Sequence, residues 1–432
     1  MNPDKLIKED YSEIGIFWLP DCKVREVVGM LSVGVRGDIK LRTYHDLSCR
    51  NNIRTTFNNK STVIDVIHGR MHSNMMVVLF DCCFYGNILH AKKMIRGNKL
   101  TQHSKINDYS FKSASIIYNN TADWLGYVFV SDRTEQVSNE INLKLRNIPS
   151  YTINGCELKL NYRWNHNIKK AELTTKDIFT FKFNNDVNIG KIIDYTSIFG
   201  DFLLLLMNVP ISPEYICLQE DESNNDIQLV HQRRNIFDVK KAKFSEIISY
   251  WDIENDFQNI LLKWFNYSLN SEINDALRIY TESYISQTAM EIAFLILFQA
   301  CEGIAKRVEP DKFKKEKVKC ILINLLKTYT KPMISILTDT CIEALADKMN
   351  KTRNYWIHNS GNIKKGDTFI EFDFDAITCL LSYTLRSYLL HQIGMSQDII
   401  KNHLSPHQVF GSTLLNDLEV QCNKILATND AT

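Results

Sequence analysis

An arginine, an amide and a histidine lie within six consecutive residues of the stretch RNYWIHNSG, residues 353–361. On a helix Asn354 and His358 are four residues apart and share a face, and the long side chain of Arg353 can turn back toward them. Imidazole titrates near neutral pH and moves protons, while a guanidinium holds phosphate oxygens with a fixed fork of donors. The set therefore suits acid–base chemistry on a phosphodiester, with the amide orienting the histidine or the substrate.

A purely structural interpretation fits the same residues. Cations near the last turn of a helix interact favourably with its unpaired carbonyl groups, which would be sufficient reason for Arg353 and His358 to stand there. We expect the two aromatic residues between them, Tyr355 and Trp356, to pack against the protein rather than to stack on bases. The spacing alone leaves both interpretations open.

The first 185 residues alternate apolar and polar side chains, with turn signals such as TINGCE between the alternating runs. This period of two predicts a mostly antiparallel β domain. Its expected strands are IGIFWLP, REVVGMLSVGV, DIKLRTYHDL, NMMVVLFDCC, EINLKLRNI, CELKLNYRW and KDIFTFKFN. Residues 190–250 are mixed, with a helix expected over 192–209 and short strands over 213–218 and 226–230.

After Trp251 the apolar residues recur with the helical period. Helices are expected over 256–269, 273–284, 286–308, 311–329, 334–358 and 373–394. Short Pro, Gly or Asn breaks join them, which is typical of a helical bundle. We therefore predict an α+β chain with a β-rich domain over 1–250, a helical domain over 251–395 and a short helical tail over 396–432.

Composition excludes several classes of protein. A net charge of +1 argues against a globally basic nucleic-acid binder, although a local basic face remains open. The eleven cysteines contain no CxxC motif, so we expect reduced thiols and a cytoplasmic location. The charged N-terminus lacks the apolar core of a signal peptide, and no apolar run reaches the roughly 18 residues of a membrane span. We expect no membrane association.

The R-x4-H motif of Arg353 and His358, near the end of a helical bundle and followed by the long helix ending LLHQIG, resembles the HEPN family. Glu302 in FLILFQACEGIAKRV falls where these proteins often carry a polar residue facing the motif. The stretch GIFWLPDCKVREVVGMLSVGVRGDIKLR is similar to the opening of the β-rich domain of ApeA-type anti-phage HEPN proteins, and DYTSIFGDFLLLLMNVPISPEYICL to its closing part.

The resemblance implies a β-rich domain followed by a HEPN bundle, and a metal-independent endoribonuclease of anti-phage defence that acts by abortive infection. It implies that Arg353, His358, Asn354 and Glu302 are catalytic, with no cofactor and no metal. A ribose 2′-hydroxyl would attack its own phosphate, leaving a 2′,3′-cyclic phosphate. The expected partners are RNA, with tRNA one candidate, and a phage-derived trigger. For Glu302 the alternative is an i,i+4 pair with Lys306 on the solvent side.

In-line transesterification is best served by two proton-transfer groups, yet the chain has one such motif. His391 on the last helix is the nearest rival, among packing residues. A two-fold homodimer would bring two motifs together. The segment AMEIAFLILFQA is apolar almost all round, so it could pack on one side against a partner. We therefore predict a homodimer through the HEPN domain.

The segment 306–319 carries seven Lys or Arg against three acidic residues. It is either a solvated helix face or an electrostatic track for RNA, in which case Lys306, Arg307, Lys314 and Lys315 bind the backbone. Other motifs are weaker. His68 and His72 lack the glutamate of a zinc protease, Asp373 and Asp375 fit helix capping better than a nucleotidyltransferase, and residues 361–368 lack the lysine of a phosphate loop.

Two further functions remain open. One is a non-catalytic HEPN scaffold that binds RNA or a partner protein. The other makes the β domain a ligand-binding module, for a carbohydrate or a peptide, with the bundle serving only for dimerisation.

Overall fold

The computed structural model of the chain describes residues 10–20, 26–34, 37–45, 47, 63–85, 88–125, 148–167, 172–220, 226–231, 246–285, 289–358, 367–370 and 373–429. The chain forms two compact units. The first comprises Met1–Ala122, Tyr127–Gly200 and Ile211–Asn235, and the second Asp123–Gly126, Asp201–Pro210 and Ile236–Thr432. The helix α2 (Ile189–Met207) is divided between the units: its residues up to Gly200 belong to the first unit, and those from Asp201 belong to the second.

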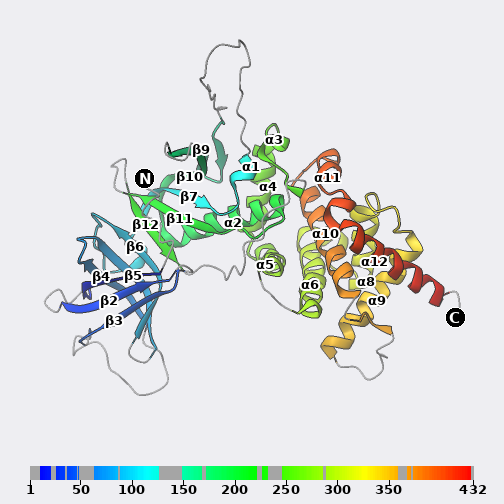
Figure 1. Cartoon of the computed structure of the whole chain (residues 1–432), viewed down its shortest axis with the longest axis horizontal. Coiled ribbons are helices and arrows are strands. Elements are labelled where there is room, and N and C mark those ends of the chain that lie inside the picture. The colour runs from blue at the N-terminus through cyan, green and yellow to red at the C-terminus, as the bar shows by residue number, and fades with distance from the viewer. Residues whose placement is uncertain are drawn as a thin grey trace, which may run out of the picture. The chain divides into compact units, whose positions relative to one another are not determined.

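Six antiparallel strands of the described residues close into a barrel in the first unit, drawn in blue in Figure 1. They are β1 (Tyr11–Trp18), β2 (Val27–Val33), β3 (Ile39–Thr43), β4 (Val63–Met71), β5 (Met76–Tyr85) and β6 (Ile88–Gly97). The order is β3-β2-β1-β4-β5-β6, and pairing of β3 with β6 closes it. Alternation places one face of each strand inside. The barrel core includes Phe17, Leu31, Leu41, Ile67, Leu79 and Met94.

The sheet continues from β6 through the described strands in the order β12-β11-β7-β10-β9-β8. These are β7 (Ser110–Tyr118), β8 (Tyr151–Ile153), β9 (Cys156–Asn167), β10 (Glu172–Asn188), β11 (Pro213–Gln219) and β12 (Ile227–His231). The first part of α2 packs on this region, because Phe199 contacts the rings of Phe179 and Phe181. Asn154 and Gly155, both at positive φ, make the two-residue turn between β8 and β9.

The predicted β-rich N-terminal fold is confirmed, and the strands expected at β1, β2, β3, β5, β9 and β10 are present. Strands β6, β7 and β8 were not predicted. Small buried residues such as Ala91 and Ala114 occupy positions where the pattern search expects large apolar side chains. The strand expected over 140–148 lies almost entirely outside the described residues.

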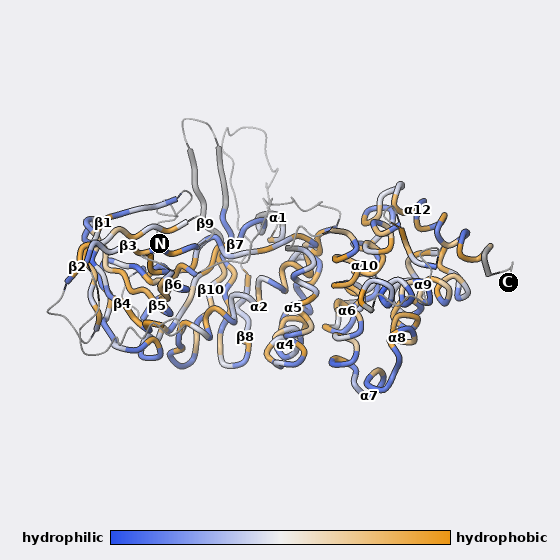
Figure 2. The backbone as a smooth tube through the Cα atoms, turned by 90° about the horizontal axis from the view of Figure 1, so that it is seen from below, coloured by the Kyte–Doolittle hydropathy of each residue, from blue (hydrophilic) through white to orange (hydrophobic). Residues whose placement is uncertain are grey.

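The second unit is helical. Its described elements are α1 (Ala122–Leu125), α3 (Tyr250–Ile253), α4 (Phe257–Leu269), α5 (Ser271–Ile285), α6 (Met290–Val308), α7 (Pro310–Phe313), α8 (Val318–Leu325), a π-helical turn η5 (Leu326–Thr330), α9 (Asp339–His358), α10 (Phe374–Gln392), α11 (Gln397–His403) and α12 (Pro406–Asn429). Figure 2 shows hydrophobic and hydrophilic residues interleaved along these helices, as amphipathic helices require. Helix α6 packs against α5, α8 and α10, whereas α9 packs against α8, η5 and α12.

The helical bundle is confirmed, with two differences. The single helix expected over 311–329 is divided into α7, α8 and η5. Its charged run Lys314–Lys317 is exposed, so no apolar contact holds those residues in a helix on the bundle. The tail from 396 contains α12, which is longer than the short helices expected there, is kinked at Gly411 and packs against α9 and α10. The predicted boundaries at 250 and 395 stay predictions.

A disulfide joins Cys341 of α9 to Cys422 of α12, with the two Cα atoms 5.7 Å apart. Both side chains are buried. The expectation that every cysteine is a reduced thiol is therefore wrong for this pair. The sequence offered no signal, because 81 residues separate the two and only the packing of α12 on α9 brings them together. Within the described residues, no helix has both the length and the apolar character needed to span a bilayer.

Candidate active site

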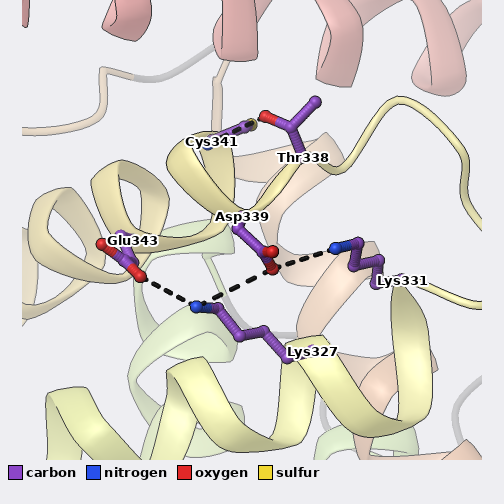
Figure 3. A network of polar contacts seen from close by, with 6 residues as sticks. All are labelled: Lys327, Lys331, Thr338, Asp339, Cys341 and Glu343. Atoms are coloured by element: carbon purple, nitrogen blue, oxygen red, sulfur yellow. Dashed lines mark hydrogen bonds and ion pairs between the residues drawn. The ribbon is translucent and has the colours of Figure 1, made fainter.

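Helix α9, which carries the R-x4-H motif, is fixed at its N-terminus by a polar network (Figure 3). Thr338 caps the helix by accepting a hydrogen bond from the amide of Cys341 at 3.2 Å. The carboxylate of Asp339 lies 3.0 Å from Lys331 Nζ, and this hydrogen bond is the main cause that lowers the pKa of Asp339. Lys327 of η5 also pairs with two carboxylates of α9. Its Nζ lies 2.8 Å from the carboxylate of Glu343 and 3.7 Å from that of Asp339. The start of α9 is therefore tied to η5.

The inner face of α9 is apolar up to the motif. The buried residues are Cys341, Ile342, Leu345, Ala346 and Met349, at the three- and four-residue spacing of one helix face. Thr352 continues this face and is fully buried. Its hydroxyl donates to Lys348 O at 2.7 Å and accepts from the amide of Phe369 at 3.1 Å. Phe369, which follows α9 in the chain, is therefore held at Thr352, the residue next to Arg353.

Arg353 and Asn354 lie together in the structure. Arg353 Nη1 donates to Asn354 Oδ1 at 3.0 Å, and both side chains are half-buried. The guanidinium of Arg353 is therefore turned toward Asn354, and a site shared with His358 stays a prediction. This contact holds the amide oxygen and leaves the amide N–H₂ directed elsewhere.

His358 is the last residue of α9, so its backbone position is one turn beyond Asn354. Its side chain lies outside the part of the molecule that the structure describes. Trp356 is 48% exposed and Ile357 also 48%, so the prediction that Trp356 packs in the protein is wrong. Its ring makes a T-shaped contact with the ring of the half-buried Tyr355, with centroids 5.9 Å apart. An exposed apolar surface therefore adjoins the motif.

Glu302 forms an i,i+4 ion pair with Lys306, which was the alternative to a catalytic role. Its carboxylate lies 2.7 Å from Lys306 Nζ. Glu302 belongs to α6, whose main packing partners are α5, α8 and α10 rather than α9. The structure does not bring Glu302 to Arg353, and its catalytic role stays a prediction.

The basic segment is partly committed to internal contacts. Lys306 is held by Glu302, and Arg307 donates to the carbonyl of Gly303 at 3.0 Å. Lys314 and Lys315 are exposed and form no ion pair with another described residue. Of the four residues predicted to bind RNA, these last two are the ones with unpaired charges.

The other motifs considered in the sequence do not form functional sites among the described residues. Within the described residues, no three His, Cys, Asp or Glu side chains are grouped to hold a metal ion. His68 is buried in β4 and contacts Tyr109 OH at 3.0 Å. Asp373 stands at the N-cap position of α10, but its side chain does not cap the helix, and its carboxylate accepts instead from the amide of Ile370, before the helix, at 3.1 Å. Residues 361–366 of the rejected phosphate loop lie outside the description. Burial lowers the pKa of His391, which packs on Tyr329.

Thr352 and Phe369, whose hydrogen bond lies next to the motif, were not among the predicted site residues. A threonine inside a helix pattern carries no signal of its own, because its partner is 17 residues away. Only the return of the chain after α9 reveals the contact.

Comparison with known protein families gives two matches. Residues 12–264 match the family described as ApeA N-terminal domain 1, and residues 277–399 match Apea-like HEPN. The second match includes α6, α9 and α10, and with them the R-x4-H motif. No curated protein and no solved structure is detectably similar to the chain.

Proposed function

Because the chain belongs to the ApeA family of HEPN proteins, a family that points to a nuclease-type role in anti-phage defence, we propose that it is a metal-independent endoribonuclease that restricts phage by abortive infection. The observation that carries the proposal is the contact of Arg353 with Asn354 on the last turns of α9, one turn before His358 and inside the HEPN match. Its substrate is RNA in the cytoplasm, with tRNA one candidate.

The proposed reaction is transesterification. His358 takes the proton from a ribose 2′-hydroxyl, the 2′ oxygen forms a bond to the adjacent phosphorus, and the bond to the 5′ oxygen breaks. A proton goes to the leaving 5′ oxygen. Arg353 stabilises the charge that develops on the phosphate oxygens. The products are a 2′,3′-cyclic phosphate and a free 5′-hydroxyl, and DNA is not a substrate because it lacks the nucleophile.

Cleavage is expected to persist in excess EDTA and to leave cyclic phosphate ends. The acid–base and cationic groups come from side chains, so the chemistry needs no Mg²⁺. The measurement is sequencing of RNA ends by a method that captures cyclic phosphates, from cells expressing wild type or His358→Ala under phage challenge, and from purified protein with EDTA. Loss of cleavage on chelation, restored by Mg²⁺ or Mn²⁺, would contradict the proposal. RNA binding without any cut would favour the non-catalytic scaffold.

We propose further that two chains share one active cleft. HEPN domains typically dimerise. The exposed Trp356 and Ile357 beside the motif provide apolar surface of the kind found at interface cores. Most of the apolar residues of α6 are already buried within the chain, with Met290 and Ile292 exposed at its start. We therefore place the interface at the end of α9 rather than along α6.

Mixed dimers are expected to be less active than their content of wild-type chains predicts. If both His358 side chains serve one cleft, a wild-type chain paired with a His358→Ala chain lacks one proton-transfer group. The measurement is RNA cleavage per wild-type chain at rising excess of the variant, with Arg278→Ala chains as the mixing control. Constant activity per wild-type chain, or a monomer in light scattering that cuts RNA, would rule out the shared cleft.

A second candidate function is favoured by a cavity in the first unit. A hollow of about 490 Å³ opens at the seam of β3, β5 and β6 in the barrel. Its lining includes Asp38, Asp81, Tyr85 and His90, and this volume is in the range of small-ligand sites. A β domain that binds a ligand or trigger is compatible with a nuclease bundle. It becomes the main function only if phage restriction depends on these residues and is insensitive to Arg353 and His358.

A further inference from the structure

One carboxylate of α9 lies between two lysines shortly before the R-x4-H motif. Asp347 Oδ1 is 2.7 Å from Lys319 Nζ of α8, and Asp347 Oδ2 is 3.0 Å from Lys351 Nζ, one turn further along α9. The packing of α8 against α9 brings the first of these lysines to the carboxylate. Two ammonium groups from different helices therefore already hold one small anion through its two oxygen atoms.

All three side chains are open to solvent, because 40% of Lys319, 38% of Asp347 and 49% of Lys351 is exposed. Burial alone would raise the pKa of the Asp347 carboxyl, but its hydrogen bonds with the two lysines outweigh burial and lower this pKa. The carboxylate is therefore ionised. Ion pairs with this much exposure contribute little to stability, so another anion can replace the carboxylate at small cost.

Lys351 belongs to the same face of α9 as the motif. Asn354 follows it by three residues, and the position of His358 follows it by seven, which is two helical turns or roughly 10 Å. The hydrogen bond of Arg353 with Asn354 lies between these two positions. A phosphate bound at Lys351 would therefore be a near neighbour, on the same RNA strand, of a phosphate bound at Arg353.

The chain around this pair is rich in positive charge. Three exposed lysines, Lys314, Lys315 and Lys317, lead into α8, and none of them forms an ion pair with a described residue. The run 314–319 contains one acid, Glu316. A phosphodiester carries a single negative charge on two free oxygens, as does the carboxylate that it would replace. The lysines thus match the backbone of a nucleic acid strand.

Resting on the proposed function, in which RNA is the substrate, we propose that Lys319 and Lys351 bind a backbone phosphate of the RNA close to the bond that is cut. In the free protein Asp347 occupies this phosphate subsite, and the RNA displaces it. The two lysines therefore raise the affinity for RNA, whereas Asp347 lowers it. Neither lysine is among the four basic residues that the sequence predicted to bind RNA.

The test measures the dissociation constant of a single-stranded RNA with methylated 2′-hydroxyls, which binds but cannot be cut, for the purified full-length protein at several KCl concentrations. Lys319→Gln and Lys351→Gln are each expected to weaken binding roughly three- to tenfold. Each is expected to lower the slope of log affinity against log salt by about 0.7, the value for one phosphate contact of a single strand. Asp347→Asn is expected to tighten binding at least roughly threefold, because a repelling charge is lost. Damage to the fold would not raise the affinity.

The opposite end of α9 provides matched controls (Figure 3). Asp339 also lies between two lysines, 3.0 Å from Lys331 Nζ and 3.7 Å from Lys327 Nζ. It precedes Arg353 by fourteen residues, or roughly 21 Å along the helix, which is beyond the screening length of about 10 Å in 0.1 M salt. Asp339→Asn and Lys331→Gln should therefore change the affinity less than about twofold. Equal gains in Asp339→Asn and Asp347→Asn would overturn the proposal.

Cleavage of unmodified RNA by the same proteins separates this proposal from the proposed function. Wild-type protein that neither binds nor cuts RNA would overturn both. If wild type cuts RNA, unchanged affinity in Lys319→Gln and Lys351→Gln would overturn the phosphate subsite alone. Unchanged or weaker binding by Asp347→Asn would do the same.

Discussion

Replacing His358 with alanine is expected to lower the rate of RNA cleavage by at least roughly a hundredfold, because a positioned general acid or base contributes about 10²–10⁴ in rate. Arg353→Ala is expected to cost a similar factor through loss of charge stabilisation on the phosphate. Arg353 is half-buried and His358 is the last residue of α9, and both come after Thr352, where the fully buried face of the helix ends. The melting temperature should therefore stay close to that of wild type.

The controls are chosen on other helices of the same unit. Arg278→Ala on α5 and His407→Ala on α12 remove exposed side chains of the same two types. They should leave cleavage and phage restriction unchanged. The measurements are single-turnover cleavage of a defined RNA and plaque counts, with circular dichroism to verify folding. Full activity in a folded His358→Ala protein would show that the assignment of this residue is wrong.

Replacing Arg386 with methionine is expected to lower the free energy of unfolding of the second unit by about 3–5 kcal/mol. Three buried carbonyls, those of Leu205, Leu206 and Glu246, would each lose a charged donor worth about 1.5 kcal/mol. A loss of this size is a large part of the about 5–15 kcal/mol that stabilises a typical domain. Methionine fills a similar volume, so a cavity contributes little to the change.

Urea unfolding followed by circular dichroism measures the change, and hydrogen exchange locates it. Exchange is expected to rise at the end of α2 and along α10, where the lost bonds lie. Arg278→Met is the matched control, because Arg278 is exposed and its loss should stay within about 0.5 kcal/mol. A fall of less than about 1 kcal/mol for Arg386→Met would mean that water replaces the guanidinium at these carbonyls.

Periodicity in the sequence was sufficient to predict the β-rich and helical regions and most of their strands and helices. The alternation of REVVGMLSVGV and the helical spacing of DFDAITCLLSYTLRSYLLHQIG appear as β2 and α10. Such signals are strong because one face of each element is buried along its whole length. Strands β6 and β7 have a weak sequence pattern, because the small residues Ala91 and Ala114 occupy buried positions in them. Closure of the barrel by β3 and β6 was equally invisible, since strand pairing leaves no local pattern.

By itself, the sequence determined the motif, its place at the end of a helix and the family to which the chain belongs, because these depend on residues that are neighbours along one element. Only the tertiary structure decided which distant side chains meet. Nothing in the sequence distinguished Arg386, yet its guanidinium donates to the carbonyls of Leu205 and Leu206 at the C-terminal end of α2. Glu302 forms an ion pair with Lys306, and Cys341 forms a disulfide with Cys422. Such pairings depend on how helices pack in space, and no spacing along the chain encodes that directly.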